Sequence, residues 1–234
     1  MPSLLQIMNL ENAKKIFRNF SKVGFVATFQ YVISDFVFDY KYKVDTINTK
    51  MLDEMEIDSP NKVHGKYYEG TNVYIFKKMF SHVEIDPSNS CFVDFGSGKG
   101  KAMIMAAEKG FRKVIGVEFS LELVEVCRTN LEVFKQKSKG KTEFEIFHMD
   151  AAEFKIPSEA NLLYFSNPFD HFLVTKVIDN ILHSLEEFPR EIVVVHLHPQ
   201  GNMAFAEHPR FHLEYESRDG FVFRLTPNNQ PLNG

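Results

Sequence analysis

The chain has no tryptophan, only two cysteines and no long hydrophobic run among its 234 residues. Cys91 falls in a predicted buried strand and Cys127 in a predicted helix, which favours reduced thiols over a disulfide and a cytoplasmic location. The longest uncharged stretch near the start, residues 23–34, has 12 residues, whereas a membrane-spanning helix needs roughly 18. We therefore expect no membrane span, and no cysteine cluster points to a metal.

A strong charge of either sign is also lacking. The 27 basic and 31 acidic residues give a formal net charge of −4 and a pI near 6.1. Proteins that bind nucleic acid broadly neutralise phosphates with a basic surface, so this balance argues against an extended nucleic-acid footprint. With 44% hydrophobic and 25% charged residues, the chain can bury a sizeable core in one main domain.

The most informative segment is residues 91–100, Cys-Phe-Val-Asp-Phe-Gly-Ser-Gly-Lys-Gly. An apolar run ends in Asp94, three glycines follow at alternate positions, and residues 101–109 favour a helix. This order predicts a strand, a tight turn and a helix. Glycine permits positive φ and lets a ligand lie against bare backbone, while a helix start offers unpaired N–H groups. The segment is typical of a loop that cradles a ligand.

The glycine spacing argues against a phosphate ligand. A dinucleotide fingerprint, Gly-x-Gly-x-x-Gly, places its third glycine at position 101, where this chain has Lys101. A P-loop has four residues between its glycines and then Lys-Ser or Lys-Thr, whereas three residues separate Gly96 from Gly100 here and Ala102 follows the lysine. A carboxylate beside the loop also repels a pyrophosphate and attracts a cation.

The pattern Asp94-x-Gly96-x-Gly98-x-Gly100 resembles motif I of the class I S-adenosylmethionine (SAM) methyltransferases. The resemblance implies that the loop passes beneath the methionine end of SAM and that Asp94 positions its ammonium group. The next predicted strand, residues 113–118, ends in Glu118, which suits the ribose hydroxyls. Phe119 follows as a candidate for the adenine face, with a position in the core as the equal alternative. The implied loop residues are Gly96, Ser97, Gly98 and Gly100.

A third strand is expected at residues 143–148, where alternation predicts one well-buried face. The acidic loop after it resembles the part of the family that binds adenine. The resemblance implies that Asp150 accepts the adenine amino group and that the backbone of Ala151 meets a ring nitrogen. An aspartate after a strand is also a common helix cap, and that interpretation stays open.

Residues 39–46 and 65–71 are rich in tyrosine, glycine and threonine, which suits a lid over the cofactor. In similar methyltransferases a tyrosine or threonine from the segment before motif I reaches the SAM carboxylate. Tyr68 and Thr71 are the candidates here, with structural packing as the equal alternative.

The predicted fourth strand stops at Asn167-Pro168-Phe169. In amino-group methyltransferases that carry Asn-Pro-Pro-Tyr, the asparagine oxygen and a proline carbonyl accept hydrogens from the target nitrogen, and the aromatic ring stacks on a planar substrate. The similarity implies Asn167 and Phe169 as catalytic residues, although the single proline departs from that pattern. Asn-Pro also ends strands without any catalytic role. Methyl transfer needs mainly alignment, so few catalytic residues are expected.

These features predict an α/β fold, a Rossmann-like doubly wound seven-stranded sheet with a C-terminal antiparallel hairpin at Asp219-Gly220. Residues 1–85 are expected to form an N-terminal, largely helical cap or lid, and residues 86–234 the SAM-binding domain. His196 and His198 share one face of a predicted strand. Because no third ligand is evident, we expect them to form a polar pocket wall or to contact solvent rather than to bind metal.

The predicted function is SAM-dependent methyl transfer to a nitrogen of a protein or small molecule, which are favoured over nucleic acid as acceptors. The motif order is also similar to that of the seven-strand protein-lysine methyltransferases, including the histone-modifying branch. Two alternatives stay open. One is a non-catalytic SAM-binding partner subunit. The other, an aminopropyltransferase, is less favoured because Asn167 replaces the acid expected after the fourth strand.

Overall fold

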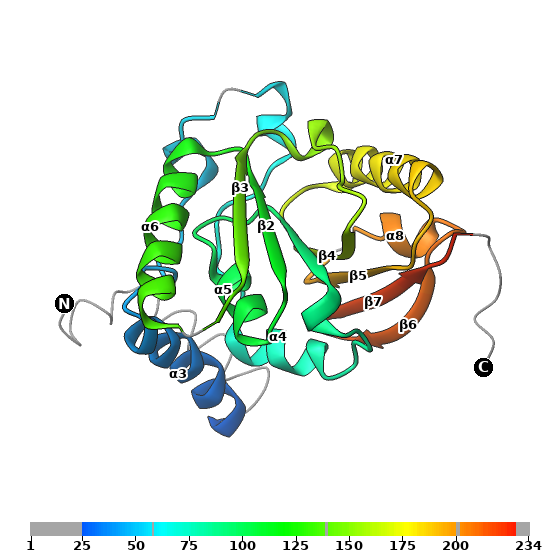
Figure 1. Cartoon of the computed structure of the whole chain (residues 1–234). Coiled ribbons are helices and arrows are strands. Elements are labelled where there is room, and N and C mark those ends of the chain that lie inside the picture. The colour runs from blue at the N-terminus through cyan, green and yellow to red at the C-terminus, as the bar shows by residue number, and fades with distance from the viewer. Residues whose placement is uncertain (1–24, 58, 139, 200–201, 228–234) are drawn as a thin grey trace.

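The computed structural model describes residues 25–57, 59–138, 140–199 and 202–227, with side chains from residue 33 onward. Residues 16–26, whose apolar spacing predicts an amphipathic helix, lie almost wholly outside this range. Helices and strands alternate after residue 90, and the strands join one sheet (Figure 1). Within the described ranges, no helix combines the length and the apolar character needed to cross a membrane.

The described strands form one seven-stranded sheet in the order β3-β2-β1-β4-β5-β7-β6. Strands β1 to β5 are parallel, whereas β7 is antiparallel to both β5 and β6. The strands are β1 Cys91–Phe95, β2 Lys113–Glu118, β3 Glu143–His148, β4 Ala160–Ser166, β5 Ile192–Leu197, β6 His212–Ser217 and β7 Gly220–Leu225. The predicted fold class and the C-terminal hairpin are confirmed. The strand order reverses between β1 and β4, where open α/β sheets bind ligands.

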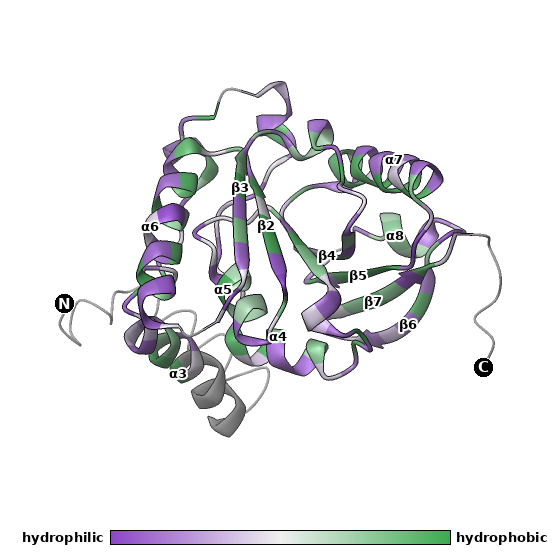
Figure 2. Cartoon of the chain, in the orientation of Figure 1, coloured by the Kyte–Doolittle hydropathy of each residue, from purple (hydrophilic) through white to green (hydrophobic). Residues whose placement is uncertain are grey.

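Helices cover both faces of the sheet, because alternate residues of a buried strand point to opposite faces. On β1, Phe92 belongs to a core cluster with α4, α5 and α6, whereas Val93 and Phe95 belong to a cluster with α7 and α8. Figure 2 shows hydrophobic residues along β5 and β7, and both hydrophilic and hydrophobic residues along α6 and α7. The helices are α3 Phe25–Tyr42, α4 Val73–Phe80, α5 Lys101–Glu108, α6 Leu121–Lys137, α7 His171–Glu187 and α8 Ala204–Glu207, with 3-10 turns η1 Leu52–Glu54, η2 Pro60–His64, η3 Pro87–Asn89 and η4 Ala151–Glu153.

Asp35 links α3 to the first turns of α4 and α5. Its carboxylate accepts hydrogen bonds from the backbone N–H of Val73 and the side chain of Asn72, at the start of α4. It also pairs at 2.7 Å with Lys101, the first residue of α5, whose side chain is 2% exposed. The segment before residue 86 is therefore bonded directly to the glycine loop region, while its division from the rest as a separate cap stays a prediction.

The prediction of a well-buried face on β3 was wrong. None of its residues is fully buried, and Phe144 and Ile146 are only partly covered. The reason is its position, because β3 pairs with β2 alone and forms an edge of the sheet. An alternating pattern in the sequence does not distinguish an edge strand from an interior one.

The prediction for His196 was also wrong, because this residue is neither a pocket wall nor a solvent contact. It is 1% exposed and lies edge-on to the rings of Phe165 and Phe205. Its strand, β5, lies between β4 and β7 with both faces covered. Burial lowers the pKa of His196 to about 3, so the ring is neutral at physiological pH. Its neighbour in the motif, His198, is half-buried.

Candidate active site

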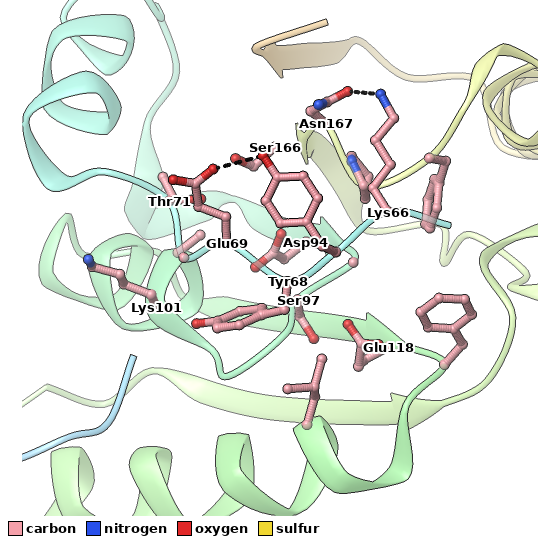
Figure 3. Close-up of a pocket in the computed structure, with 18 of the residues that line it drawn as sticks. Lys66, Tyr68, Glu69, Thr71, Asp94, Ser97, Lys101, Glu118, Ser166 and Asn167 are labelled. Carbon is pink, nitrogen blue, oxygen red and sulfur yellow. Dashed lines mark hydrogen bonds between the residues drawn. The ribbon is translucent and has the colours of Figure 1, made fainter. Parts of the chain in front are cut away.

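A cleft opens at the carboxyl ends of β1, β2 and β4, beneath residues 66–71, and encloses about 580 Å³ of space, part of it open to solvent (Figure 3). The predicted site residues that line it are Tyr68, Thr71, Asp94, Gly96, Ser97, Glu118, Phe119, Asn167 and Phe169. The predicted site residues Gly98, Gly100, Asp150 and Ala151 do not belong to this lining.

The glycine loop adopts the left-handed backbone that its sequence predicts. Gly96 and Gly98 have φ of +74° and +52°. A Cβ at Gly96 would lie 2.4 Å from Pro168, and one at Gly98 would lie 2.3 Å from the Tyr68 ring. In this structure the glycines make room for other parts of the protein. They let the loop lie against the Asn167-Pro168 turn on one side and the Tyr68 segment on the other.

Two acidic side chains are buried at the base of the cleft. Glu118 accepts backbone N–H bonds from Gly98 and Ser120, each at 2.9 Å. Asp94 is equally buried but has no hydrogen bond or ion pair to any residue that the structure describes. Burial raises the pKa of both carboxyls, and the charge of Glu118 adds to the effect on Asp94. A buried carboxyl without a partner is costly, so Asp94 is suited to a cationic ligand group.

Ser97 adds a second unpartnered group to the same wall. Its hydroxyl is buried, and no residue within the described part of the chain bonds to it. Together with Asp94 it fits a ligand that carries both a cation and polar groups. By contrast, no set of three His, Cys, Asp or Glu side chains in the described ranges is arranged to hold a metal ion.

The two lid candidates, Tyr68 and Thr71, differ in what they can offer a ligand. The Tyr68 hydroxyl donates its hydrogen to the carbonyl of Thr46 at 2.9 Å. The Thr71 hydroxyl instead accepts a hydrogen from Tyr164 at 3.1 Å, which leaves its own hydrogen available. A ligand carboxylate needs a donor, so Thr71 is the better suited of the two.

Asn167 lies at the opposite end of the cleft from Glu118 (Figure 3). It follows β4 with φ of +51°, a conformation that asparagine tolerates better than most residues. Its Oδ1 accepts a hydrogen bond from the ε-amine of Lys66 at 2.6 Å. Phe169, two residues on, is buried beside it. The Asn-Pro turn therefore presents a side-chain amide oxygen to the same cleft that holds Asp94.

Asp150 is held away from this cleft by other partners. Its Oδ1 caps η4 by accepting the N–H of Ala152, and its Oδ2 accepts from Ser59 and Asn61. The alternative interpretation as a helix cap is thus confirmed, and the adenine role of Asp150 and Ala151 stays a prediction. Oδ2 is bonded by a segment about 90 residues earlier in the chain, and no local sequence pattern indicates this contact.

Ten residues that line the cleft were not among the sequence candidates, and they include the polar residues Lys66, Glu69, Lys101 and Ser166. Lys66 and Glu69 belong to residues 65–71, the segment predicted as a lid. The high content of polar and aromatic residues in that segment was the sequence feature that could have indicated them. Ser166 is the last residue of β4, at the strand end where ligands bind.

The chain matches the model of the histone methylation protein DOT1 family over residues 31–201. Its fold is similar to that of the Escherichia coli protein yhhF, named as a methyltransferase, with 12% identity, a TM-score of 0.53 and coverage of 68% of this chain and 94% of that one. An RNA methyltransferase from Salinibacter ruber, solved with S-adenosyl-L-homocysteine, has 22% identity, a TM-score of 0.45 and coverage of 70% and 97%. No curated protein sequence matches the chain.

The unpartnered Asp94 and Ser97, the donor hydrogen of Thr71 and the strand-end Glu118 fit the ammonium, carboxylate and ribose of SAM. The family match spans most of the chain and includes every element that forms the cleft. The chain therefore belongs to the DOT1 histone methylation family, it is a methyltransferase, and SAM is its methyl donor.

Proposed function

We propose that the protein methylates an amine nitrogen and that its acceptor is the ε-amine of a lysine in another protein. The observation that carries this proposal is the amide oxygen of Asn167, which faces the cleft that contains Asp94 and already accepts a hydrogen bond from a lysine ε-amine at 2.6 Å. The family name, histone methylation protein, supports a protein acceptor. The net charge of −4 is unfavourable for nucleic acid.

Residues of this chain would hold SAM at its methionine part and at its ribose. Asp94 would pair with the ammonium and Thr71 would donate its hydroxyl hydrogen to the carboxylate. Glu118 would take the ribose hydroxyls with lone pairs that its two backbone bonds leave available. SAM supplies a methyl group on a positively charged sulfur, which is a good leaving group, so the protein's main contribution is alignment.

Asn167 would align the acceptor. Its Oδ1 accepts a hydrogen from the amine, which orients the nitrogen lone pair away from the amide and toward the cleft. In this chain the carbonyl of Pro168 already accepts the N–H of Lys66 at 3.1 Å. The asparagine side chain is therefore the principal acceptor that the turn offers to a substrate nitrogen.

The N-terminal segment would act as a lid. Residues 66–71 form one side of the cleft, and Asp35 and Lys101 bond α3 to the helix that follows the glycine loop. The cap predicted for residues 1–85 stays a proposal, and its residues 1–24 lie outside the described ranges. Buried free thiols at Cys91 and Cys127 support a reducing compartment.

The test uses SAM with a labelled methyl group and four acceptors, namely core histones, nucleosomes, a lysine-rich peptide and total RNA. We expect label on protein lysines and none on RNA. Asn167→Ala is expected to retain SAM affinity within about threefold and to lose turnover by about 100-fold. Label on RNA alone, or SAM binding without transfer to any acceptor, would overturn the proposal, the second result favouring a non-catalytic SAM-binding subunit.

A further inference from the structure

Lys66 is fixed in place by its backbone. Residues 64–66 pair with residues 168–170 as a short antiparallel ribbon. The N–H of Lys66 donates to Pro168 at 3.1 Å, and the N–H of Asp170 donates to His64 at 2.9 Å. The side chains of His64 and Asp170 pair at 2.7 Å across the same ribbon. The start of the Lys66 side chain is therefore held beside the Asn167 turn.

The Lys66 side chain extends along the cleft wall and ends at the Asn167 amide, as Figure 3 shows. Its ε-amine thus occupies the position that the proposed function gives to the acceptor nitrogen. Burial lowers the pKa of Lys66, although the charge of Asp170 opposes this effect. A lower pKa increases the fraction of neutral amine, the form with a lone pair that can attack a methyl group.

We infer that Lys66 is a site of self-methylation, in which its ε-amine takes the place of a substrate lysine within the same chain. This inference rests on the proposed function. The Nζ lone pair forms a bond to the methyl carbon as the carbon–sulfur bond breaks, and the electrons of that bond remain on sulfur. The products are methylated Lys66 and S-adenosylhomocysteine, and one proton passes from Nζ to water.

Self-methylation would change how the cleft receives other acceptors. An unmodified Lys66 occupies the oxygen of Asn167, so an external amine must displace it. Each added methyl group removes one N–H donor, and a trimethylated Lys66 has none left for Asn167. Full methylation would therefore release the amide oxygen for a substrate lysine.

The first test follows methylation by mass. The purified protein is incubated with SAM that carries a deuterated methyl group, and its peptides are analysed by mass spectrometry. We expect label on Lys66 at a rate per molecule that does not change with protein concentration. Lys66→Arg should remove this label, whereas Lys62→Arg should keep it, because Lys62 lies in the same segment but bonds to the carbonyl of Met55. A rate that rises with concentration would overturn transfer within one chain.

The second test needs no SAM and no turnover. n-Butylamine, which has the length of a lysine side chain, is titrated against the protein alone and followed by NMR. If Lys66 occupies the amine position, Lys66→Met should bind n-butylamine at least about tenfold more tightly than the unaltered protein. Lys62→Met, the matched control, should bind it as the unaltered protein does. Equal affinities for Lys66→Met and the unaltered protein would overturn the placement of Lys66.

Different results would overturn the self-methylation of Lys66 and the proposed function. Label on histone lysines with none on Lys66 would overturn self-methylation and leave the proposed function intact. An absence of label on every acceptor, in protein that binds SAM, would overturn both.

Discussion

Glu118 accepts the backbone N–H of Gly98 at 2.9 Å, so the acid at the end of β2 holds the loop that follows β1. The other carboxylate oxygen accepts the N–H of Ser120 at the start of α6. One buried side chain therefore fixes the position of two backbone segments at the base of the cleft, the glycine loop and the start of α6. The same carboxylate is the candidate ribose ligand.

We predict that Glu118→Ala lowers the free energy of unfolding by about 2–5 kcal/mol, because it leaves two buried N–H donors without acceptors. Glu118→Gln keeps one acceptor oxygen and should lose clearly less. Urea denaturation of both variants measures the difference. If Glu118→Ala unfolds at the same urea concentration as the unaltered protein, the side chain does not hold the loop.

Asp94 gives a prediction with a defined pH dependence. Its pKa is raised in the folded protein, mainly by burial and further by Glu118. Between the ordinary carboxyl pKa and the raised pKa of the folded protein, Asp94 is protonated in the folded state but ionised in the unfolded chain. Asp94 therefore lowers stability as pH rises through this range. We predict that Asp94→Asn is more stable than the unaltered protein by about 1–3 kcal/mol near neutral pH.

The advantage of Asp94→Asn should shrink as pH falls toward the ordinary carboxyl pKa of about 4, where the unfolded aspartate also holds its proton. Thermal unfolding of both proteins across this pH range measures it. A variant that is less stable at every pH would show that Asp94 has a stabilising partner and is not held ready for a cation.

At Asn167, the effect of the backbone conformation on stability can be separated from the effect of the side chain on turnover. At a φ of +51° glycine is unstrained, so Asn167→Gly keeps the turn while removing the side chain. We predict unchanged or slightly higher stability and a turnover about 100-fold lower. Asn167→Ala should lose the same turnover and also about 1 kcal/mol of stability, because alanine is strained in this conformation. Normal turnover in Asn167→Gly would remove its catalytic assignment.

The link between the cap and the glycine loop gives a further prediction. Asp35→Ala leaves the buried Lys101 without its partner and frees the N–H of Val73, which we expect to cost about 3–5 kcal/mol of stability. The matched control is Lys41→Ala, which breaks an exposed pair with Glu108 between the same two helices and should cost less than about 1 kcal/mol. Chemical denaturation compares the two, and equal losses would contradict a specific anchoring role for Asp35.

Much of the sheet was predictable because its signals are local. The acid and glycines of residues 94–100 define one strand end, and the apolar runs that end at Glu118 and Asn167 define two more. Parallel strand ends meet at one edge of a sheet, so placing these residues in one cleft required only the fold class. In the structure, Asp94, Glu118 and Asn167 line one cleft.

The features that could not be predicted from the sequence depend on contacts between segments that are distant in the chain. Asp150 is engaged by Ser59 and Asn61, and Lys66 reaches Asn167 only because residues 64–66 pair with the turn about 100 residues later. His196 and β3 were misjudged for a related reason. Burial depends on which strands become neighbours, and that order is a property of the whole sheet.

Calorimetric titration of the protein and of Asp94→Asn with SAM, S-adenosylhomocysteine and NAD tests the central claim most directly. The account predicts that SAM and S-adenosylhomocysteine bind once per chain, that NAD gives no heat of binding, and that Asp94→Asn weakens SAM by at least about tenfold while remaining folded. Undiminished SAM binding by Asp94→Asn would contradict the placement of SAM on the acid at the end of β1.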